Sequence, residues 1–272
     1  MVTQAIIPLA GLGTRLLPLS SVIPKELLPI NGKPNLEYIM DECIEAGIKQ
    51  FIFVVPKNRP SIKKYFFNDN FYKKILKKKK NDKRLKNVFK RLKKLQKMIK
   101  FVYQNKPEGT GHAVLQCKKY LKGTHFLMLL ADDLIVKKNC SKEMISLHRK
   151  TKGSVIATRK VERRTVSRWG ILGFKNKTKN SFLIKEVIEK PKLSEAPSNY
   201  AIIGRYILPR KILSVLKMQG RGKGGEIHIT DAIKTLVKKD EKFYGNIFKG
   251  KYIDCGTLDG FIKSGLTISK YL

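Results

Sequence analysis

Short apolar segments recur along the first half of the chain without alternating between apolar and polar positions. They cover residues 5–9, 50–55, 99–104 and 126–130. A strand that is apolar at every position is buried on both faces, as in a parallel sheet. Pro34 and Gly47 bracket apolar residues at helical spacing, and residues 111–120 form a second such stretch. Repetition of strand and helix predicts a doubly wound α/β fold.

The pattern changes to short strands from residue 154 onward. Strands are predicted at 154–161, 170–174, 182–188, 198–208, 243–247 and 251–255, and helices near 210–216, near 230–238 and from 258 towards 271. Neither an internal repeat nor a low-complexity linker interrupts the 272 residues. We therefore predict one domain over residues 1–272, with residues 1–153 as a first half and residues 154–272 as a second.

Basic residues outnumber acidic ones along the chain, with 58 Lys and Arg against 21 Asp and Glu and a net charge of +37. Residues 73–100 hold 15 of the basic residues and one acid. Their apolar positions Leu85, Val88, Phe89, Leu92, Leu95 and Ile99 have helical spacing, which predicts a helix with one buried stripe and a solvated lysine face. Aromatic residues are not interleaved with these lysines, and the other 20 acids lie elsewhere. We therefore expect no nucleic-acid partner, and a basic nucleic-acid-binding protein is the less favoured alternative function.

The four cysteines are scattered and have neither a C-x-x-C pair nor a nearby histidine at metal-ligand spacing. They are typical of free thiols in a reducing compartment. The longest apolar stretch, residues 126–131, is too short to span a bilayer, and the first apolar segment has no charged leader before it. We expect a cytoplasmic protein with no membrane association.

Two short segments near the N-terminus carry candidate chemistry. The first follows the first predicted strand and consists of Ala10, Gly11, Leu12, Gly13, Thr14 and Arg15. Its glycines allow backbone N–H groups to approach a ligand, and its arginine adds a guanidinium, so the segment suits an anion. The second places Lys25 and Glu26 between Pro24 and Pro29, which stiffen the loop. Either segment by itself has an ordinary structural explanation as a turn.

Polar residues also stand at the ends of three predicted strands, where sites form in α/β proteins. Asp132 and Asp254 each follow an apolar segment, and Gln104 ends another. Two carboxylates of this kind suit a divalent metal that phosphates also bind. An aspartate after a strand can instead only cap the turn.

Taken together, these segments resemble the signature of the bacterial UDP-glucose pyrophosphorylases, or UTP:glucose-1-phosphate uridylyltransferases, which reads A-G-L-G-T-R and then P-K-E-x-L-P. Further matches follow in order along nearly the whole chain: Gln104, Gly109-Thr110-Gly111-His112-Ala113, Asp132, Trp169-Gly170, Glu189-Lys190-Pro191, residues 196–199, Gly204-Arg205-Tyr206, Gly225-Glu226-Ile227, Thr230-Asp231-Ala232 and Asp254-Cys255-Gly256. The resemblance implies a Rossmann-like mixed sheet, the nucleotidyltransferase fold, whose β-rich half binds a sugar.

The resemblance implies a nucleotide site and a set of catalytic residues. The nucleotide would be bound by Ala10, Gly11, Leu12, Gly13, Thr14, Arg15, Lys25, Gln104, Gly109 and Gly111, with Gln104 reading the uracil edge. The catalytic residues would be Arg15, Lys25, Asp132, Lys190 and Asp254. Because the attacking phosphate is already ionised, such a site needs positive charge and alignment more than acid–base groups.

On the sugar side, the resemblance implies that Gly170, Glu189 and Lys190 bind the sugar phosphate. It implies that Asp132 and Asp254 hold Mg²⁺ as the cofactor. Asp133 departs from the apolar residue common at that position, so a shared metal role for it stays open. The implied substrates are UTP and glucose 1-phosphate, the products are UDP-glucose and pyrophosphate, and the implied assembly is a homodimer or homotetramer.

Two further readings of the same residues remain. A thymidylyl- or cytidylyltransferase acting on a sugar 1-phosphate shares the glycine loop and a P/S-K-x-L-P segment. Ala10, the Glu26 of P-K-E and the G-E-I-x-x-T-D-A stretch favour the uridylyl branch. A non-catalytic sugar-nucleotide binder would be expected to lose Lys25, Asp132, Lys190 or Asp254. All four are present.

Overall fold

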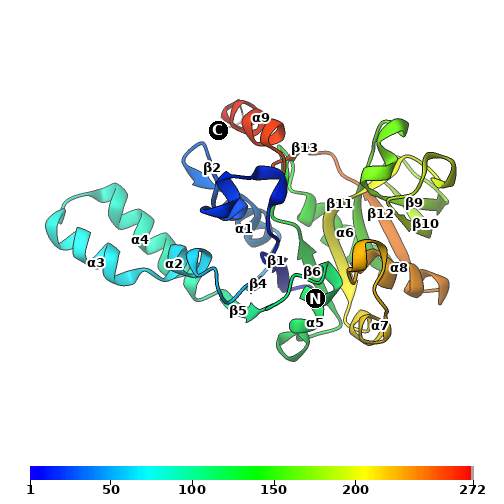
Figure 1. The fold of residues 1–272 in the computed structure, drawn as a ribbon, viewed down its shortest axis with the longest axis horizontal. Helices are drawn as coiled ribbons and strands as arrows, with labels where there is room; N and C mark the ends of the chain where they lie inside the picture. The colour runs from blue at the N-terminus through cyan, green and yellow to red at the C-terminus, as the bar shows by residue number, and fades with distance from the viewer. Residues whose placement is uncertain (271–272) are drawn as a thin grey trace.

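A mixed β-sheet runs through the whole molecule in the computed structural model, which describes residues 1–270 (Figure 1). Within these residues, nine strands form the sheet in the order β5-β4-β1-β6-β11-β8-β12-β10-β9. The strands are β1 Gln4–Pro8, β4 Gln50–Val55, β5 Ile99–Tyr103, β6 His125–Leu129, β8 Ser154–Lys160, β9 Gly170–Lys175, β10 Ser181–Glu189, β11 Tyr200–Pro209 and β12 Phe243–Ile247. Strands β5, β4, β1 and β6 are parallel, and β11 pairs antiparallel with β6 and with β8.

Helices cover both faces of the sheet. They are α1 Asn35–Glu45, α2 Ser61–Phe67, α3 Asp69–Lys78, α4 Lys83–Gln96, α5 Thr110–Gln116, α6 Cys140–Thr151, α7 Ile212–Met218, α8 Ile229–Lys238 and α9 Leu258–Ser269. Apolar residues of α1, α2, α4, α6 and α9 pack in one buried cluster, and those of α5, α7 and α8 pack in another. The doubly wound α/β fold predicted from the sequence is therefore confirmed.

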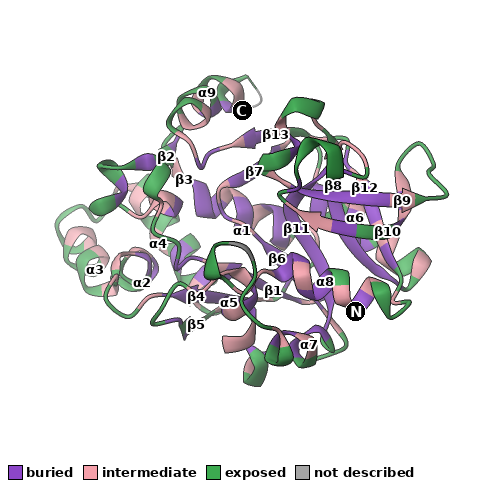
Figure 2. Cartoon of the chain, turned by 45° about the vertical axis from the view of Figure 1, so that its right-hand side comes forward, coloured by how far each residue is buried: buried purple, intermediate pink, exposed green. Residues whose placement is uncertain are grey.

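Three of the four apolar segments of the first half, β1, β4 and β6, are buried on both faces. The prediction is wrong for β5, which lies at the edge of the sheet and leaves Lys100 and Tyr103 exposed. Ala5 and Ile7 face one core cluster, whereas Ile6 between them faces the other. The purple strands at the centre of Figure 2 show this burial. Because successive strand residues point to opposite faces, such a segment fits only a sheet covered by helices on both sides.

Helices α3 and α4 extend as an arm from one end of the sheet, at the left of Figure 1. The predicted stripe is present in part, since Leu92 and Leu95 of α4 are buried while the lysines of α4 are exposed. The prediction is wrong for Val88, which is exposed, and for Ile99, which belongs to β5 and not to the helix. Arg91 ties the arm to the body, because its guanidinium donates to Glu37 and to Asp41 of α1, both at 2.7 Å.

Helices α2 and α3 were not predicted from the sequence. Helix α3 is rich in lysine, whereas the helical spacing of Ile62, Tyr65 and Phe66 in α2 was an available signal.

Most of the other predicted elements are found within a few residues of their expected bounds. The stretch 111–120 is an exception, because α5 ends at Gln116 and a 3-10 turn, Lys118–Tyr120, follows it. Helix α6 and strand β7, Asp133–Val136, were not predicted. The last predicted helix extends to Ser269, and Tyr271 lies outside the described residues.

Strand β7 pairs antiparallel with β13, Lys251–Asp254, in a small second sheet at the carboxyl ends of the central strands. This pairing sets Asp254 opposite Asp133. The backbone N–H of Cys255 also donates to the carbonyl of Asp132 at 2.8 Å. Two segments about 120 positions apart in sequence therefore meet at one point.

Within residues 1–270, no helix is long and apolar enough to cross a membrane.

Candidate active site

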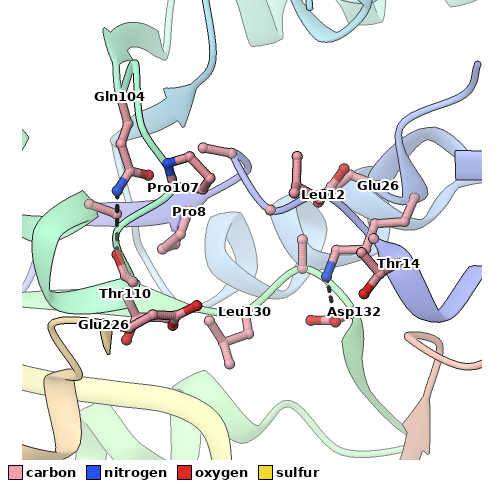
Figure 3. Close-up of a pocket in the computed structure, with 17 residues that line it drawn as sticks. Pro8, Leu12, Thr14, Glu26, Gln104, Pro107, Thr110, Leu130, Asp132 and Glu226 are labelled. Atoms are coloured by element: carbon pink, nitrogen blue, oxygen red, sulfur yellow. Dashed lines mark hydrogen bonds and ion pairs between the residues drawn. The ribbon is translucent and has the colours of Figure 1, made fainter. Parts of the chain in front are cut away.

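A cavity of about 410 Å³ opens beside the glycine loop that follows β1 (Figure 3). Its walls come from the ends of β1, β5 and β6, as expected for an α/β sheet. Nine of the residues predicted to bind nucleotide or metal line it: Ala10, Gly11, Leu12, Gly13, Thr14, Lys25, Gln104, Gly109 and Asp132. The other predicted site residues, Arg15, Gly111, Gly170, Glu189, Lys190 and Asp254, lie outside its lining.

The glycine loop has a conformation that leaves its backbone donors accessible. Gly13 has φ 67°, and a Cβ there would lie 3.1 Å from the Cβ of Ser20. The hydroxyl of Ser20 donates to the carbonyl of Gly13 at 2.8 Å and holds the turn. Within the described chain, the backbone N–H groups of residues 10–13 donate no hydrogen bond to other protein groups. Such donors suit an anionic ligand.

Two cations and two carboxylates converge at one side of the cavity. The ammonium of Lys25 lies 2.6 Å from Oδ2 of Asp132. The guanidinium of Arg15 lies 3.6 Å from Asp132 and 3.9 Å from Asp254. A Cβ on Gly256 would lie 2.7 Å from both Arg15 and Asp132, so a side chain there would obstruct this cluster.

The electrostatics of the cluster favour the ionised forms of Lys25 and Asp132. Burial by itself would lower the pKa of Lys25, but attraction to Asp132 and Glu26 outweighs burial and the pKa is raised. Burial would raise the pKa of Asp132, but attraction to Lys25 and the hydrogen bond from it lower the pKa instead. Glu26 differs, because burial raises its pKa to about 7 against the opposing attraction of Lys25.

The donor set at this point fits a divalent metal bound together with a phosphorylated ligand. Asp132 and Asp254 are the two carboxylates within 4 Å of the Arg15 guanidinium. Among residues 1–270 no cluster of three or more His, Cys, Asp or Glu side chains could hold a metal. Magnesium is commonly held by one or two carboxylates with water and substrate phosphates completing the shell. Two aspartates suffice for that arrangement.

Gln104 lies at the opposite side of the cavity, where its amide is held by neighbours. Its Nε2 lies 2.9 Å from Nδ1 of His112 and 3.4 Å from the carbonyl of Gly109, to which it donates. The other ring nitrogen of His112 lies 2.8 Å from Nε2 of Gln116. His112 therefore fixes the orientation of Gln104.

Gly109 and Gly111 have a packing reason to be glycine. A Cβ on Gly109 would lie 2.6 Å from the carbonyl oxygen of Ile227, and one on Gly111 would lie 2.8 Å from the same atom. The N–H of Gly111 donates to that carbonyl at 2.8 Å. Gly109 lines the cavity, whereas Gly111 is buried between α5 and the 226–228 loop. A direct role of Gly111 in binding nucleotide stays a prediction.

The residues predicted to bind the sugar phosphate form a second group at the start of β9 and the end of β10. Gly170 pairs with Glu189 across these strands. A Cβ on Gly170 would lie 3.1 Å from the carboxylate of Glu189, so this glycine leaves Glu189 its space. Lys190 has φ 47°, a left-handed conformation, and its N–H donates to the carbonyl of Trp169 at 2.9 Å. The structure thus brings all three residues together.

Several residues of the site were given no role by sequence reasoning. Thr110 and Glu226 line the cavity, and Glu26 does so as a buried acid. Tyr252 donates its hydroxyl to Asp133 at 2.6 Å. The stretch Gly225-Glu226-Ile227 belonged to the ordered matches and was the available signal for Glu226. For Tyr252 the sequence offered no signal, because its partner is far away along the chain.

Comparison with known proteins places the chain among nucleotide-transferring enzymes. A model of the nucleotidyl transferase family matches residues 4–270. The chain is 38% identical over 273 residues to UTP–glucose-1-phosphate uridylyltransferase 2 of Staphylococcus saprophyticus, covering 97% of this chain and 90% of that protein. It is 36% identical to UTP–glucose-1-phosphate uridylyltransferase of Staphylococcus haemolyticus, covering 97% of this chain and 91% of that protein.

Solved structures give the same result. A UDP-glucose pyrophosphorylase complexed with UDP-glucose is 34% identical, with a TM-score of 0.86 and full coverage of both chains at 100%. A UTP-bound enzyme of this kind from Acinetobacter baumannii is 32% identical, with a TM-score of 0.85 and coverage of 98% of this chain and 93% of that one. The chain belongs to the nucleotidyl transferase family and, within it, to the UTP–glucose-1-phosphate uridylyltransferases, or UDP-glucose pyrophosphorylases.

Proposed function

We propose that this chain makes UDP-glucose and pyrophosphate from UTP and α-D-glucose 1-phosphate. The observation that carries the proposal is the convergence of Arg15, Lys25, Asp132 and Asp254 beside a cavity that the glycine loop and Gln104 also line. That cavity offers donors for a triphosphate at one side and an amide for a base at the other.

The nucleotide would lie with its phosphates at the cationic side. The backbone N–H groups of residues 10–13, with Arg15 and Lys25, would bind the β- and γ-phosphates. The amide oxygen of Gln104 would accept a hydrogen bond from the N–H on the edge of uracil, because its NH₂ group already contacts His112 and Gly109. The fixed contact with His112 supports this role, because an oriented amide discriminates bases better than a mobile one.

Glu189 and Lys190 suit the second substrate. The carboxylate of Glu189 would accept hydrogen bonds from glucose hydroxyls, and the ammonium of Lys190 would bind the sugar phosphate. Gly170 stands opposite Glu189 and, lacking a side chain, leaves the carboxylate of Glu189 its space. A ligand with hydroxyls at one end and phosphate at the other fits this pair.

The reaction would be an in-line displacement. An oxygen of glucose 1-phosphate forms a bond to the α-phosphorus of UTP while the bond from that phosphorus to the bridging oxygen of the β-phosphate breaks. The electron pair of the broken bond stays on pyrophosphate, which Arg15 and Lys25 would neutralise as it leaves. The attacking oxygen carries no proton to remove, so this chain's residues align and neutralise charge.

The family generally uses a divalent metal, and we propose Mg²⁺ held by Asp132 and Asp254. Bound there, it would neutralise charge on the phosphates that meet at this point. Arg15 and Lys25 lie against these carboxylates in the structure. When the metal ion and UTP bind, the two cations would contact the phosphates instead. The predicted homodimer or homotetramer and the predicted cytoplasmic location stay proposals.

Nucleotide choice tests the proposed function. We expect turnover of UTP with glucose 1-phosphate to exceed that of dTTP or CTP, measured as pyrophosphate release at equal concentrations. Omission of glucose 1-phosphate is the control for simple triphosphate hydrolysis. A clear preference for dTTP would overturn the proposal in favour of a thymidylyltransferase.

A further inference from the structure

Asp133 is a buried carboxylate that the proposed reaction does not use. It is 9% exposed and lies outside the lining of the cavity, although Asp132 beside it lines that cavity. Both of its oxygens accept hydrogen bonds from the protein. Oδ1 accepts from the hydroxyl of Tyr252 at 2.6 Å, and Oδ2 accepts from the N–H of Gly204 at 3.1 Å.

The contact with Gly204 depends on an irregularity in β11. The register of β11 against β8 shifts between Ile202 and Tyr206, which leaves the N–H of Gly204 outside the ladder. A Cβ on Gly204 would lie 2.3 Å from Oδ2 of Asp133, so glycine permits the close approach. The N–H of Leu130 donates to the carbonyl of Gly204 at 2.8 Å. The turn that carries Asp132 is therefore attached to the central sheet at two points.

Tyr252 of β13 attaches the same turn to the second, smaller sheet through its hydrogen bond to Asp133. It stands two residues before Asp254, and the antiparallel pairing sets Asp254 opposite Asp133. The ring of Tyr252 also meets the ring of Trp169 at 6.1 Å between centroids and 72° between planes. Trp169 directly precedes Gly170 at the proposed sugar site. The Tyr252 side chain thus contacts both the carboxylate-bearing turn and the sugar side.

Burying a carboxylate costs free energy, and the two groups that donate hydrogen bonds to Asp133 are both uncharged. An apolar side chain at this position would avoid the cost of removing a charge from water. The hydrogen bonds of Asp133 have a direction, which apolar contacts lack. They fix the backbone segments that carry Asp132 and Asp254. Groups that orient metal ligands from behind act in this way.

We propose that Tyr252 and Asp133 are positioning residues, whose hydrogen bond sets Asp132 and Asp254 at the separation needed to bind a divalent metal with the nucleotide. The inference rests on the proposed function, because it takes these two aspartates as the metal ligands. It assigns no contact with substrate to Tyr252 or Asp133. Their effect is on metal affinity and on kcat.

The test compares Tyr252→Phe, Asp133→Asn and Asp133→Leu with the wild-type enzyme. Phenylalanine keeps the ring against Trp169 and removes the hydroxyl, whereas asparagine keeps an oxygen that can accept one hydrogen bond. The matched control is Tyr38→Phe, because the Tyr38 hydroxyl donates to the carbonyl of Ile30 at 2.9 Å, outside the site. Two readouts are needed: the Mg²⁺ dependence of turnover, and Mn²⁺ binding in the presence of UTP, followed by the loss of the free-ion EPR signal.

We expect Tyr252→Phe to weaken Mn²⁺ binding about 10- to 100-fold and to raise the half-saturating Mg²⁺ concentration by a similar factor. The KM for glucose 1-phosphate should stay within about twofold of wild type. Trp169 is the chain's one tryptophan, so its fluorescence reports whether the ring contact survives. Asp133→Asn should retain more metal affinity than Asp133→Leu, and Tyr38→Phe should match wild type.

Wild-type Mn²⁺ binding by Tyr252→Phe would overturn the inference, and so would a loss of thermal stability with unchanged metal affinity. If Asp133→Leu fails to fold, Tyr252→Phe and Asp133→Asn decide the result. The proposed function fails separately, if the wild-type enzyme does not turn over UTP. A weakened Mn²⁺–UTP complex in Tyr252→Phe would then still support the positioning role.

Discussion

Lys25 and Glu26 are neighbours in sequence but have opposite environments. The ammonium of Lys25 meets Asp132 at 2.6 Å, and that attraction keeps it charged. Glu26 is 2% exposed, and burial raises its pKa to about 7. The difference shows that a short motif specifies residue types, whereas the charge each one carries depends on what packs around it.

This shift predicts a pH dependence of stability. Because the pKa of Glu26 rises from 4.5 to about 7 on folding, the folded state binds the proton more tightly than the unfolded state does. Its stabilising effect is complete below pH 4.5 and is lost as the pH rises through 7. We expect the stability of Glu26→Gln relative to wild type to increase by about 3 kcal/mol between pH 4.5 and pH 8.

Urea unfolding at several pH values measures this difference. Glu162→Gln is the control, because the Glu162 side chain is 66% exposed. A stability gap between Glu26→Gln and wild type that stays constant over this pH range would contradict the expected ionisation of Glu26.

Asp132 carries the largest expected effect on turnover among single residues. Asp132→Asn keeps the shape of the side chain and removes the charge that a metal and Lys25 would meet. We expect kcat/KM to fall at least about 100-fold, with circular dichroism unchanged. Asp259→Asn on an exposed part of α9 is the control. Full activity of Asp132→Asn would refute a metal role for this residue.

At the scale of elements, the start of α5 depends on close contact with the 226–228 loop. The carbonyl of Ile227 accepts from Gly111, and its N–H donates to the carbonyl of Glu108 at 2.9 Å. Arg221 adds an ion pair to Glu108 at 2.5 Å. This loop carries Glu226 to the cavity wall, so the packing of two backbone segments shapes one end of the cavity.

Gly109→Ala tests that packing. Its Cβ would lie 2.6 Å from the Ile227 carbonyl, at φ +100°, so the loop must move. We expect a higher KM for UTP and a stability loss of about 1–3 kcal/mol. Gly123→Ala is a matched control, since Gly123 also has positive φ, +74°, but a Cβ there has no atom within 4 Å. Equal effects in both variants would show that backbone strain alone is responsible.

At the scale of the whole molecule, a buried ion pair connects the two halves of the chain. Arg205 of β11 is 0% exposed and its guanidinium lies 3.0 Å from the carboxylate of Glu42 in α1. Glu42 also accepts from the backbone N–H and the hydroxyl of Ser141 in α6. The pair therefore connects residues of the first half to the strand that passes beside the site.

Glu42→Gln should be strongly destabilising, because it removes the carboxylate that is hydrogen-bonded to the buried Arg205 cation. We expect a loss of about 3–5 kcal/mol in the free energy of unfolding, measured by urea denaturation. Glu45→Gln is the control, since the Glu45 side chain is 63% exposed and its partner Lys142 lies 3.9 Å away. That control should cost less than about 1 kcal/mol. Similar losses in both variants would contradict a special role for the buried pair.

The sequence by itself determined the class of fold, the family and most of the residues around the cavity. Apolar runs and helical spacing are local patterns, so they identified β1, β4, β5 and β6 and the buried stripe of α4. The glycine loop and the P-K-E segment are likewise contiguous, and their residue types limit which ligands they can bind. Helix α3 was missed where dense charge masks that spacing, and the short α2 was missed although its apolar residues have helical spacing.

Only the tertiary structure decided which distant groups meet. Asp132 and Asp254 come together because β7 pairs with β13, and Asp133 meets Tyr252 through the same pairing. The packing reason for Gly109 is a carbonyl more than 100 positions away, at Ile227. Pairing between segments so far apart depends on the assembly of the whole fold, so it cannot be predicted from local spacing along the chain.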